Sequence, residues 1–470
     1  MTHQLDIARL LNDACGPDVV TPGPEVPERY RHDWAGLEPI EPAALVQPRR
    51  TEEVSAALRV CQANGIPVVP QGGLTGISGA AHPIADGIVL SLERMNKILS
   101  VDPLEATLTA EAGTVLETAQ EAADEAGLML AIDIGARGSC QLGGLVATNA
   151  GGHNVIRYGM TRDQLLGLEV VLADGTIVDD FNTLTKNNAG LDLKHLFVGT
   201  EGLFGIITRC TMRLHPGQTE KQTALIGCPD TDALLDLLAR AKKSLGPMLT
   251  CFEVMWPSFY ETMAERCGIR TAIEGKHGVY AILEATGGAG SMAREKMESL
   301  LENAFEAGCV ADAVLANSVK EEHELWAVRE TPAEYGAVIG QIVPFDVGVP
   351  TRQIPEAVRL FETRLKERWP DIIALSYGHI GDNNLHLVVH VPGQEAQPEQ
   401  HVKELVYGTV RELGGTISAE HGIGLIKRDY MSYSRSPSQI RTMQLLKSAL
   451  DPKGILNPGK GFDQIKTASA

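Results

Sequence analysis

Glycines gathered into short runs are the feature of this sequence that most restricts its fold. The chain has 470 residues, and many of its 48 glycines fall within 72–79, 135–152 and 199–205. Adjacent glycines let backbone N–H groups converge without clashes between Cβ atoms, an arrangement that suits a phosphate. The first run follows the apolar segment 66–69, so a tight turn between two strands is the alternative, and the residues alone leave both open.

Composition indicates a folded protein that does not bind nucleic acid. Acidic residues outnumber basic ones 60 to 41, a formal net charge of −19, while 44% of the residues are hydrophobic. This acidic balance argues against non-specific binding to nucleic acid. The length exceeds what one hydrophobic core usually serves, so we expect two or three domains.

The eight cysteines are scattered and contain no C-x-x-C pair, which argues against a thiolate zinc site. Unpaired thiols fit a reducing compartment. The N-terminal residues show neither a basic start nor an apolar run, and no uncharged apolar stretch reaches about 18 residues. We therefore expect a cytoplasmic protein, with a polar association with a membrane surface left open.

Alternating helix and strand patterns predict an α+β protein with an antiparallel sheet in its second half. Helices are expected at 5–11, 52–64, 116–126, 231–244, 291–307, 321–335 and 354–368, with a last helix capped by Ser436-Pro437. Strands are expected at 66–69, 87–92, 168–172, 205–214, 279–284, 345–349 and 385–391. Residues 135–152 are expected to form one long loop. The predicted domains are 1–218, 219–415 and a C-terminal segment 416–470 that completes the site.

The densest chemical signal is the segment from Tyr377 to His386, joined by 418–424, which reads Ser-Ala-Glu-His-Gly-Ile-Gly. The turn at 381–384 would bring His379 and His386 together. Two imidazoles with Glu420 make a three-ligand divalent site with open positions. The alternative is that both histidines only satisfy buried hydrogen bonds; His390 is interpreted as structural.

Two near matches to nucleotide motifs are set aside. No strict G-x-G-x-x-G occurs, so the Rossmann fingerprint is absent. Residues 454–460 spell most of a P-loop, but Gly461 stands where the motif needs a hydroxyl. We interpret this as a chance match.

The three glycine segments, in this order, resemble the FAD-binding domain of the vanillyl-alcohol oxidase/PCMH superfamily. The match to its D-2-hydroxy-acid dehydrogenase branch covers nearly the whole chain and includes G-H-x-G-D-x-N-x-H and S-x-E-H-G-x-G. The resemblance implies a PCMH-type two-subdomain FAD domain, an α+β substrate domain and a small C-terminal helical segment. It also implies FAD, expected to be non-covalent, with Cys140 and His153 near it but not attached to it.

The same resemblance assigns the cofactor-binding residues. The pyrophosphate would lie at Gly72, Gly73, Leu74, Thr75 and Gly76; the isoalloxazine and ribityl side at Ser139, Gly143, Thr148, Asn149 and Gly151; the adenosine part at Glu201, Gly202 and Ile207.

It further implies that His379, His386 and Glu420 bind a divalent metal. Zinc suits this ligand set, and manganese or cobalt remain open. His421 would be the catalytic base and contact substrate, and Arg329 would bind the substrate carboxylate. Without the resemblance, a surface salt bridge of Arg329 with Glu330 or Glu322 would be preferred. Asn383 stands where a Gly is usual, and Asn tolerates positive φ better than most residues.

The expected reaction is oxidation of a D-2-hydroxy acid to the 2-keto acid by hydride transfer to flavin N5. Members specific for 2-hydroxyglutarate carry a Lys and an Asn where this chain has Pro344 and Val388, which favours a D-lactate-like or other short, apolar substrate. The alternatives are a D-2-hydroxyglutarate dehydrogenase, a flavin alcohol oxidase that uses O₂, and a non-catalytic flavin protein. The expected partners are the 2-hydroxy acid, an electron acceptor (an electron-transfer flavoprotein, a quinone or a dye-like molecule) and a second copy in a homodimer.

Overall fold

The computed structural model describes residues 2–16, 18–184 and 186–462, with side chains from residue 6 onward. The chain divides into two compact units. Unit 1 comprises Met1–Gly152, Gly159–Gly217 and Glu420–Ala470, and unit 2 comprises His153–Tyr158 and Gln218–Ala419. Both units mix helices with largely antiparallel sheets, so the predicted α+β class is confirmed. The three-domain division stays a prediction.

Unit 1 contains three sheets and their covering helices. Its strands are β1 Val20–Pro22, β2 Ala44–Val46, β3 Val68–Gln71, β4 Ile88–Ser91, β5 Ile98–Asp102, β6 Thr107–Glu111, β7 Leu128–Met129, β8 Leu165–Val171, β9 Ile177–Asp180, β10 Ile206–Arg213 and β11 His215–Pro216. Its helices are α1 Thr2–Cys15, α2 Thr51–Asn64, α3 Leu116–Glu125, α4 Leu142–Thr148, α6 Thr161–Gln164, α7 Lys194–Phe197 and α15 Pro437–Leu450.

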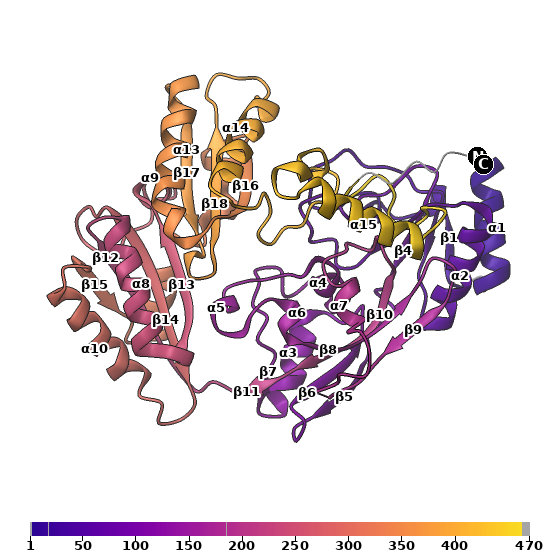
Figure 1. The fold of residues 1–470 in the computed structure, drawn as a ribbon, viewed down its shortest axis with the longest axis horizontal. Coiled ribbons are helices and arrows are strands. Elements are labelled where there is room, and N and C mark those ends of the chain that lie inside the picture. The colour runs from indigo at the N-terminus through magenta and orange to yellow at the C-terminus, as the bar shows by residue number, and fades with distance from the viewer. Residues whose placement is uncertain (1, 17, 185, 463–470) are drawn as a thin grey trace. The chain divides into compact units, whose positions relative to one another are not determined.

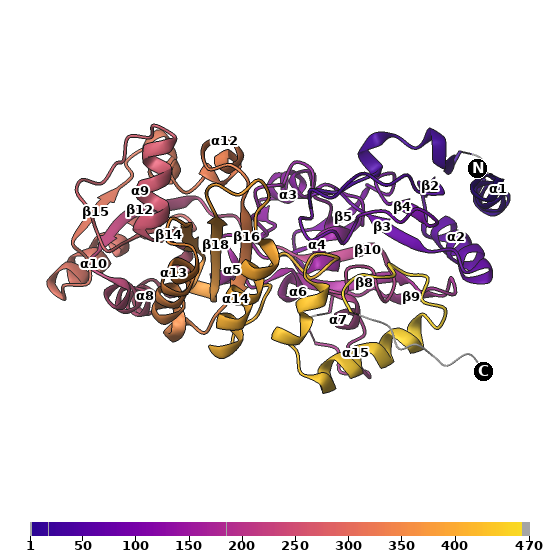
Figure 2. The same ribbon diagram turned by 90° about the horizontal axis from the view of Figure 1, so that it is seen from above.

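The sheet orders of unit 1 are β1-β2-β4-β3, β5-β6-β10-β8-β9 and β11-β7. In the first sheet β4 pairs in parallel with both β2 and β3, whereas the five-stranded sheet is antiparallel. Helices α1 and α2 lie side by side (Figures 1 and 2). One apolar core connects both larger sheets to Ile455 and Leu456, so the C-terminal segment is part of this unit's core.

Unit 2 is built on a single seven-stranded sheet. Its strands are β12 Glu220–Cys228, β13 Leu249–Met255, β14 Val279–Gly287, β15 Asp312–Leu315, β16 Val343–Gly348, β17 Ile373–Gly378 and β18 Asn384–His390. Its helices are α5 Val155–Tyr158, α8 Thr231–Leu245, α9 Pro257–Arg266, α10 Ala293–Glu306, α11 Val319–Trp326, α12 Tyr335–Val338, α13 Ile354–Arg368 and α14 Glu399–Glu412.

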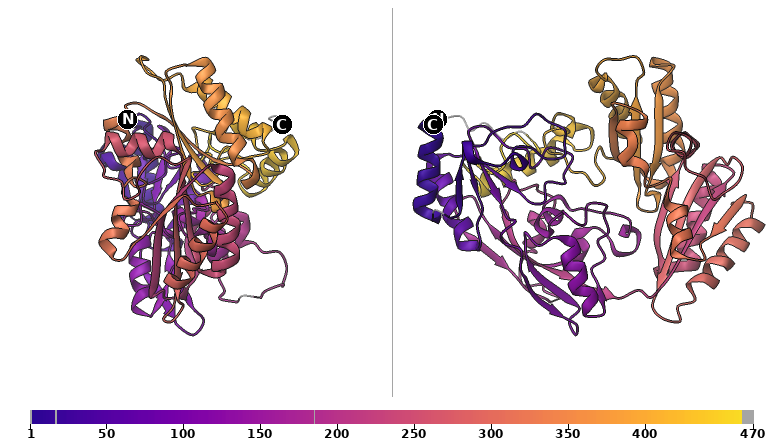
Figure 3. Two further views of the ribbon diagram at one scale, coloured as in Figure 1. Left: turned by 90° about the vertical axis from the view of Figure 1, so that its left-hand side faces the viewer. Right: turned by 180° about the vertical axis from the view of Figure 1, so that it is seen from behind.

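All neighbours in the order β15-β12-β14-β13-β17-β18-β16 are antiparallel. In Figure 2, α9 and α12 lie on one side of this sheet and α8, α13 and α14 on the other. The orange pair α13 and α14 is also seen together in Figure 3. On the side of α9, a cluster rich in aromatic residues joins that helix to α11 and α12.

Two predicted elements differ from the structure. The expected loop 135–152 contains helix α4, because Leu142, Leu145 and Val146 recur at helical spacing and are buried, which outweighs the paired glycines. The expected helix 321–335 ends at Trp326, and a short 3₁₀ turn with Pro332 near its start follows it. A proline inside a helix removes a hydrogen bond and clashes with the preceding turn, which accounts for the break.

Two smaller predictions are confirmed. The hydroxyl of Ser436 accepts a hydrogen bond from the backbone N–H of Gln439 and so caps α15. Asn383 has φ of 77°.

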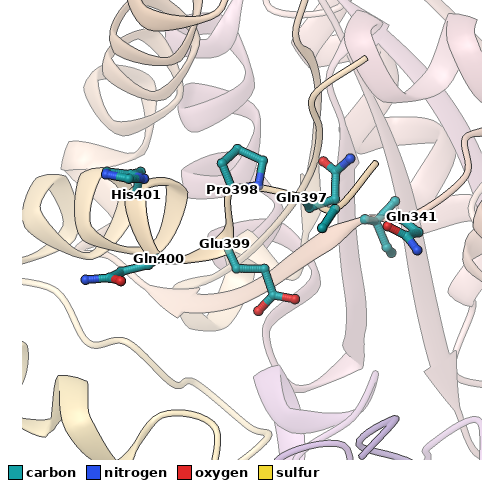
Figure 4. Close-up of a pocket in the computed structure, with 8 residues that line it drawn as sticks. Gln341, Gln397, Pro398, Glu399, Gln400 and His401 are labelled. Atoms are coloured by element: carbon teal, nitrogen blue, oxygen red, sulfur yellow. The ribbon is translucent and has the colours of Figure 1, made fainter. Parts of the chain in front are cut away.

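A surface cavity of about 580 Å³ lies in unit 2 at the start of α14 (Figure 4). It is lined by Gln341, Ile342 and residues 396–401, none of which is a predicted site residue. Within the described part of the chain, every helix is too short or too polar to cross a bilayer.

Candidate active site

Glycines of the second and third runs line an apolar cavity of about 90 Å³ in unit 1. Its lining comes from β3, the loop after β3, the residue after β4, α4, the loop before β10 and the start of β10. It consists of Pro70, Ala80, Ala81, Leu92, Gly143, Gly144, Ala147, Thr148, Glu201, Gly202, Gly205, Ile206 and Ile207. Five predicted cofactor residues are therefore together here: Gly143, Thr148, Glu201, Gly202 and Ile207. Small side chains leave the backbone accessible, as a dinucleotide seat requires.

Helix α4 positions one wall of this cavity. Its face with Leu142, Leu145 and Val146 is buried in the core of unit 1. Gly143 lies against Ala112, where an added Cβ would come within 2.6 Å of the alanine Cβ. The wall can therefore approach β6 closely only with glycine at this position.

The other predicted cofactor residues do not line the cavity. They are Gly72, Gly73, Leu74, Thr75, Gly76, Ser139, Asn149 and Gly151. Asn149 ends α4 with φ of 51° and its side chain accepts a hydrogen bond from the backbone N–H of Arg162. An added Cβ on Gly151 would lie 2.4 Å from Oε1 of Glu420, so this glycine makes room for a carboxylate.

Glu201 holds the loop that carries His421. Its buried carboxylate accepts hydrogen bonds from the N–H groups of Ile423 (2.6 Å) and Gly424 (2.8 Å). Burial raises the pKa of Glu201, against the opposing effect of these two donors. The Ser78 hydroxyl donates to the carbonyl of His421 at 2.6 Å. The carboxylate expected near adenosine thus bonds to the backbone of residues 423–424.

Glu420 and His421 are both half-buried in unit 1. Oε1 of Glu420 accepts a hydrogen bond from the N–H of Gly152 at 2.9 Å. The catalytic-base and metal-ligand candidates of the C-terminal segment are thereby attached to the glycine-rich loop after α4.

The two predicted metal-binding histidines come together in unit 2. His379 follows β17 directly and His386 lies in β18, opposite Tyr377 of β17. Their ring centroids are 5.3 Å apart at an interplanar angle of 80°, and both residues are buried. His153, carried into this unit by the segment 153–158, has its ring 5.4 Å from that of His379 and 5.3 Å from that of Trp326.

Arg329 is not in a surface salt bridge. It is 8% exposed, and its Nε donates to Oε2 of Glu253 at 2.7 Å. Its guanidinium carbon lies 4.7 Å from the centre of the Tyr377 ring. Oε1 of Glu253 also pairs with Nδ1 of His379. Burial alone would raise the pKa of Glu253, but the charges of His379 and Arg329 hold it well below its usual range.

Sequence reasoning missed Glu253 and Asp346, which are both about 1% exposed. Asp346 lies in β16 directly opposite His386. A usable signal was present: each carboxylate stands inside an apolar strand pattern, and buried acids are rare unless they are paired.

Comparison with known proteins places the chain in a family. A model of the FAD binding domain matches residues 42–180, and a model of the C-terminal domain of FAD linked oxidases matches residues 218–461. The chain belongs to the FAD-linked oxidases and is an FAD-dependent oxidoreductase. The predicted relationship to D-2-hydroxy-acid dehydrogenases is confirmed by the relatives that follow.

The chain is 36% identical to the mitochondrial D-2-hydroxyglutarate dehydrogenase of Arabidopsis thaliana, over 92% of this chain and 77% of that protein. It is 36% identical to the D-2-hydroxyglutarate dehydrogenase of Xanthomonas citri pv. viticola, over 93% and 92%. It is 35% identical to a putative mitochondrial D-lactate dehydrogenase of Schizosaccharomyces pombe, over 92% and 84%.

Among solved structures, p-cresol methylhydroxylase shares the fold, with a TM-score of 0.76 and 17% identity over 98% of both chains. This neighbour confirms the predicted PCMH-type architecture.

The prediction of a cytoplasmic location is contradicted. The relatives from Arabidopsis thaliana, Rattus norvegicus, Bos taurus and Schizosaccharomyces pombe are named as mitochondrial proteins, although the Xanthomonas relative is bacterial. The reasoning failed because scattered free thiols report a reducing environment, which does not single out one compartment.

Proposed function

We propose that this protein oxidises a D-2-hydroxy acid to the corresponding 2-keto acid, with non-covalent FAD and a divalent metal. The observation that carries the proposal is the group of His379, His386 and Arg329, buried together in one unit of an FAD-linked oxidase. An arginine suits a carboxylate, and paired imidazoles suit a metal that binds an adjacent hydroxyl. A 2-hydroxy acid carries both groups on neighbouring carbons.

The donor chemistry of unit 2 fits a metal. His379 and His386 are buried with ring centroids 5.3 Å apart, and a buried carboxylate lies beside each ring. Ala419, the residue before Glu420, donates its N–H to Asp346 at 3.1 Å. Glu420 is our third ligand, and two imidazoles with one carboxylate favour zinc, with manganese and cobalt as alternatives.

Each side chain has one task in the proposed reaction. Arg329 binds the substrate carboxylate through guanidinium N–H groups other than the Nε that Glu253 occupies. His421 accepts the hydroxyl proton as general base. His379, His386 and Glu420 would hold the metal, whose bound form would lower the pKa of that hydroxyl, and bound FAD would supply the hydride acceptor for C2.

The FAD seat proposed here is the cavity of unit 1 together with the first glycine loop, Gly72 to Gly76. A covalent bond through Cys140 is disfavoured, since burial raises the pKa of its thiol to about 11 and the nucleophilic thiolate is scarce. Non-covalent FAD is therefore our proposal. The electron acceptor and the homodimer stay predictions.

The substrate side chain is proposed to be short and apolar. Val388 lies two residues after His386 on the same face of β18 and packs in the apolar cluster with Tyr335, Tyr377 and Ile339. Its strand partner is the exposed Pro344. These two positions offer no cation or amide to a second carboxylate, which argues against 2-hydroxyglutarate even though several relatives are named for it.

The test is anaerobic bleaching of the bound flavin by a panel of D- and L-2-hydroxy acids, repeated after removal of metal with EDTA. D-lactate and its apolar homologues should bleach the flavin, the L-enantiomers should not, and metal removal should abolish bleaching until zinc or manganese is restored. Bleaching by D-2-hydroxyglutarate alone would overturn the substrate assignment. Full bleaching after complete metal removal would overturn the proposal that the reaction needs a metal.

A further inference from the structure

Two buried carboxylates flank the two predicted metal-binding histidines along the sheet of unit 2. Glu253 lies in β13, His379 directly after β17, His386 in β18 and Asp346 in β16, and β13-β17-β18-β16 is the order of the sheet. An acid therefore stands on the outer side of each imidazole. Both acids are about 1% exposed.

Each carboxylate lies on the Nδ1 side of its imidazole, Glu253 in direct contact and Asp346 at a longer, ion-pair distance. Oε1 of Glu253 pairs with Nδ1 of His379, and Oδ1 of Asp346 lies 3.9 Å from Nδ1 of His386. A histidine whose Nδ1 is held by an acid presents the opposite nitrogen, Nε2, to a ligand. Glu253 holds His379 in this way, and the nearby charge of Asp346 favours the same orientation of His386, so that both Nε2 atoms would face one ion.

Each carboxylate also makes a second contact. Oε2 of Glu253 accepts the Nε–H of Arg329 at 2.7 Å. Oδ2 of Asp346 accepts the N–H of Ala419 at 3.1 Å and the hydroxyl of Ser418 at 3.3 Å. Glu253 thus links His379 to Arg329, the proposed binder of the substrate carboxylate. Asp346 lies between His386 and the segment that leads to Glu420 and His421.

We propose that Glu253 and Asp346 are positioning residues of the metal centre, which fix His379 and His386 for coordination through Nε2. The inference rests on the proposed function, since it assumes that these histidines bind a metal. It adds that the affinity for the metal is set by two acids that do not touch it. Such outer carboxylates typically change metal affinity by 10- to 100-fold when they are removed.

The experiment measures metal affinity directly, on the FAD-loaded protein, by competition for zinc with chelators of graded strength. Glu253→Gln and Asp346→Asn preserve shape and remove the charge. We expect each to bind zinc about 10–100-fold more weakly than the wild type. Excess zinc should restore flavin reduction in Asp346→Asn, a rescue that a merely structural defect would not show.

The matched control is Glu169→Gln. Glu169 is a buried acid of unit 1 that pairs with Arg209 and accepts hydrogen bonds from Thr51 and Thr208, so it resembles Glu253 without touching a proposed ligand. Its zinc affinity should equal that of the wild type. If Glu253→Gln does not fold, Asp346→Asn, which leaves the Arg329 pair intact, decides the proposal.

The outcomes separate the two claims. If the wild type binds zinc and both variants bind it with the same affinity, the positioning role is overturned and the proposed function stands. A wild type that binds neither zinc nor manganese yet reduces its flavin with a 2-hydroxy acid would overturn the metal centre, and the positioning role with it.

Discussion

The candidate sites of the two units consist of different kinds of residue. In unit 1 the cavity is walled by glycines, alanines and aliphatic side chains, and Glu201 uses its carboxylate on backbone N–H groups. In unit 2 the candidate site consists of buried charged and aromatic side chains: Glu253, Arg329, Asp346, His379 and His386.

The contrast shows how each site can fail. A seat made of backbone depends on space, so added volume should harm it while polar substitutions nearby should not. A cluster of buried charges depends on pairing, because a buried charge that loses its partner is costly. Three predictions test whether the two regions differ in this way.

The largest effect is expected for His421→Ala. Removing a general base typically costs 10²–10⁴-fold, so kcat for the 2-hydroxy acid should fall by about that factor while the protein still binds FAD. Stopped-flow flavin reduction measures it, and the exposed His401, changed to Ala, is the control. Near-normal reduction with full flavin content would remove His421 from the reaction.

A smaller effect is expected for Gly144→Leu. Gly144 lines the cavity, and a Cβ added to it meets no atom within 4 Å, so the folded chain tolerates a side chain that the cofactor should not. We expect FAD affinity to fall at least about tenfold, or about 1.4 kcal/mol, with unfolding temperature in the FAD-free state kept or raised, since glycine is a poor helix former.

Gly408→Leu is the matched change in unit 2. Gly408 lies in α14, also with open space at its Cβ, and does not line the cavity, so FAD affinity should not change. Equal FAD binding by both leucine variants would contradict the idea that unit 1 recognises its ligand through free space.

Per pH unit, the smallest effect is expected for Lys460, a buried lysine of unit 1 that donates to the carbonyls of Ala80 and His82. Burial lowers its pKa to about 7, against the opposing charges of Asp33 and Glu201. The unfolded chain therefore holds this proton between about pH 7 and 10 while the folded chain has lost it. Stability should rise with pH across that window, by up to about 1 kcal/mol per pH unit.

Lys460→Met should lack this rise. Chemical unfolding of both proteins at pH 7, 8 and 9 measures the difference in slope. If the unfolding free energies of the two proteins change in parallel with pH, Lys460 keeps its proton in the folded protein. Unit 1 would then accommodate a buried charge as unit 2 does.

Local sequence patterns predicted many elements well. The helix expected at 354–368 is α13, and the expected helix 52–64 is α2 with one more residue at its start. Such segments carry their own information, because apolar spacing and caps act within a few residues. The patterns failed where neighbouring signals conflicted, as in α4, whose apolar spacing competed with its glycines, and after Trp326, where a proline interrupted the spacing.

The candidate site divides in the same manner. The sequence by itself indicated His379 and His386, since a short turn between adjacent strands brings two nearby residues together, and it singled out the glycine runs. Only the tertiary structure paired Arg329 with Glu253, 76 positions away, and set Asp346 opposite His386. The reason is physical: a buried charge needs a partner, but which partner it finds depends on sheet order and register, which are set by the packing of the whole unit.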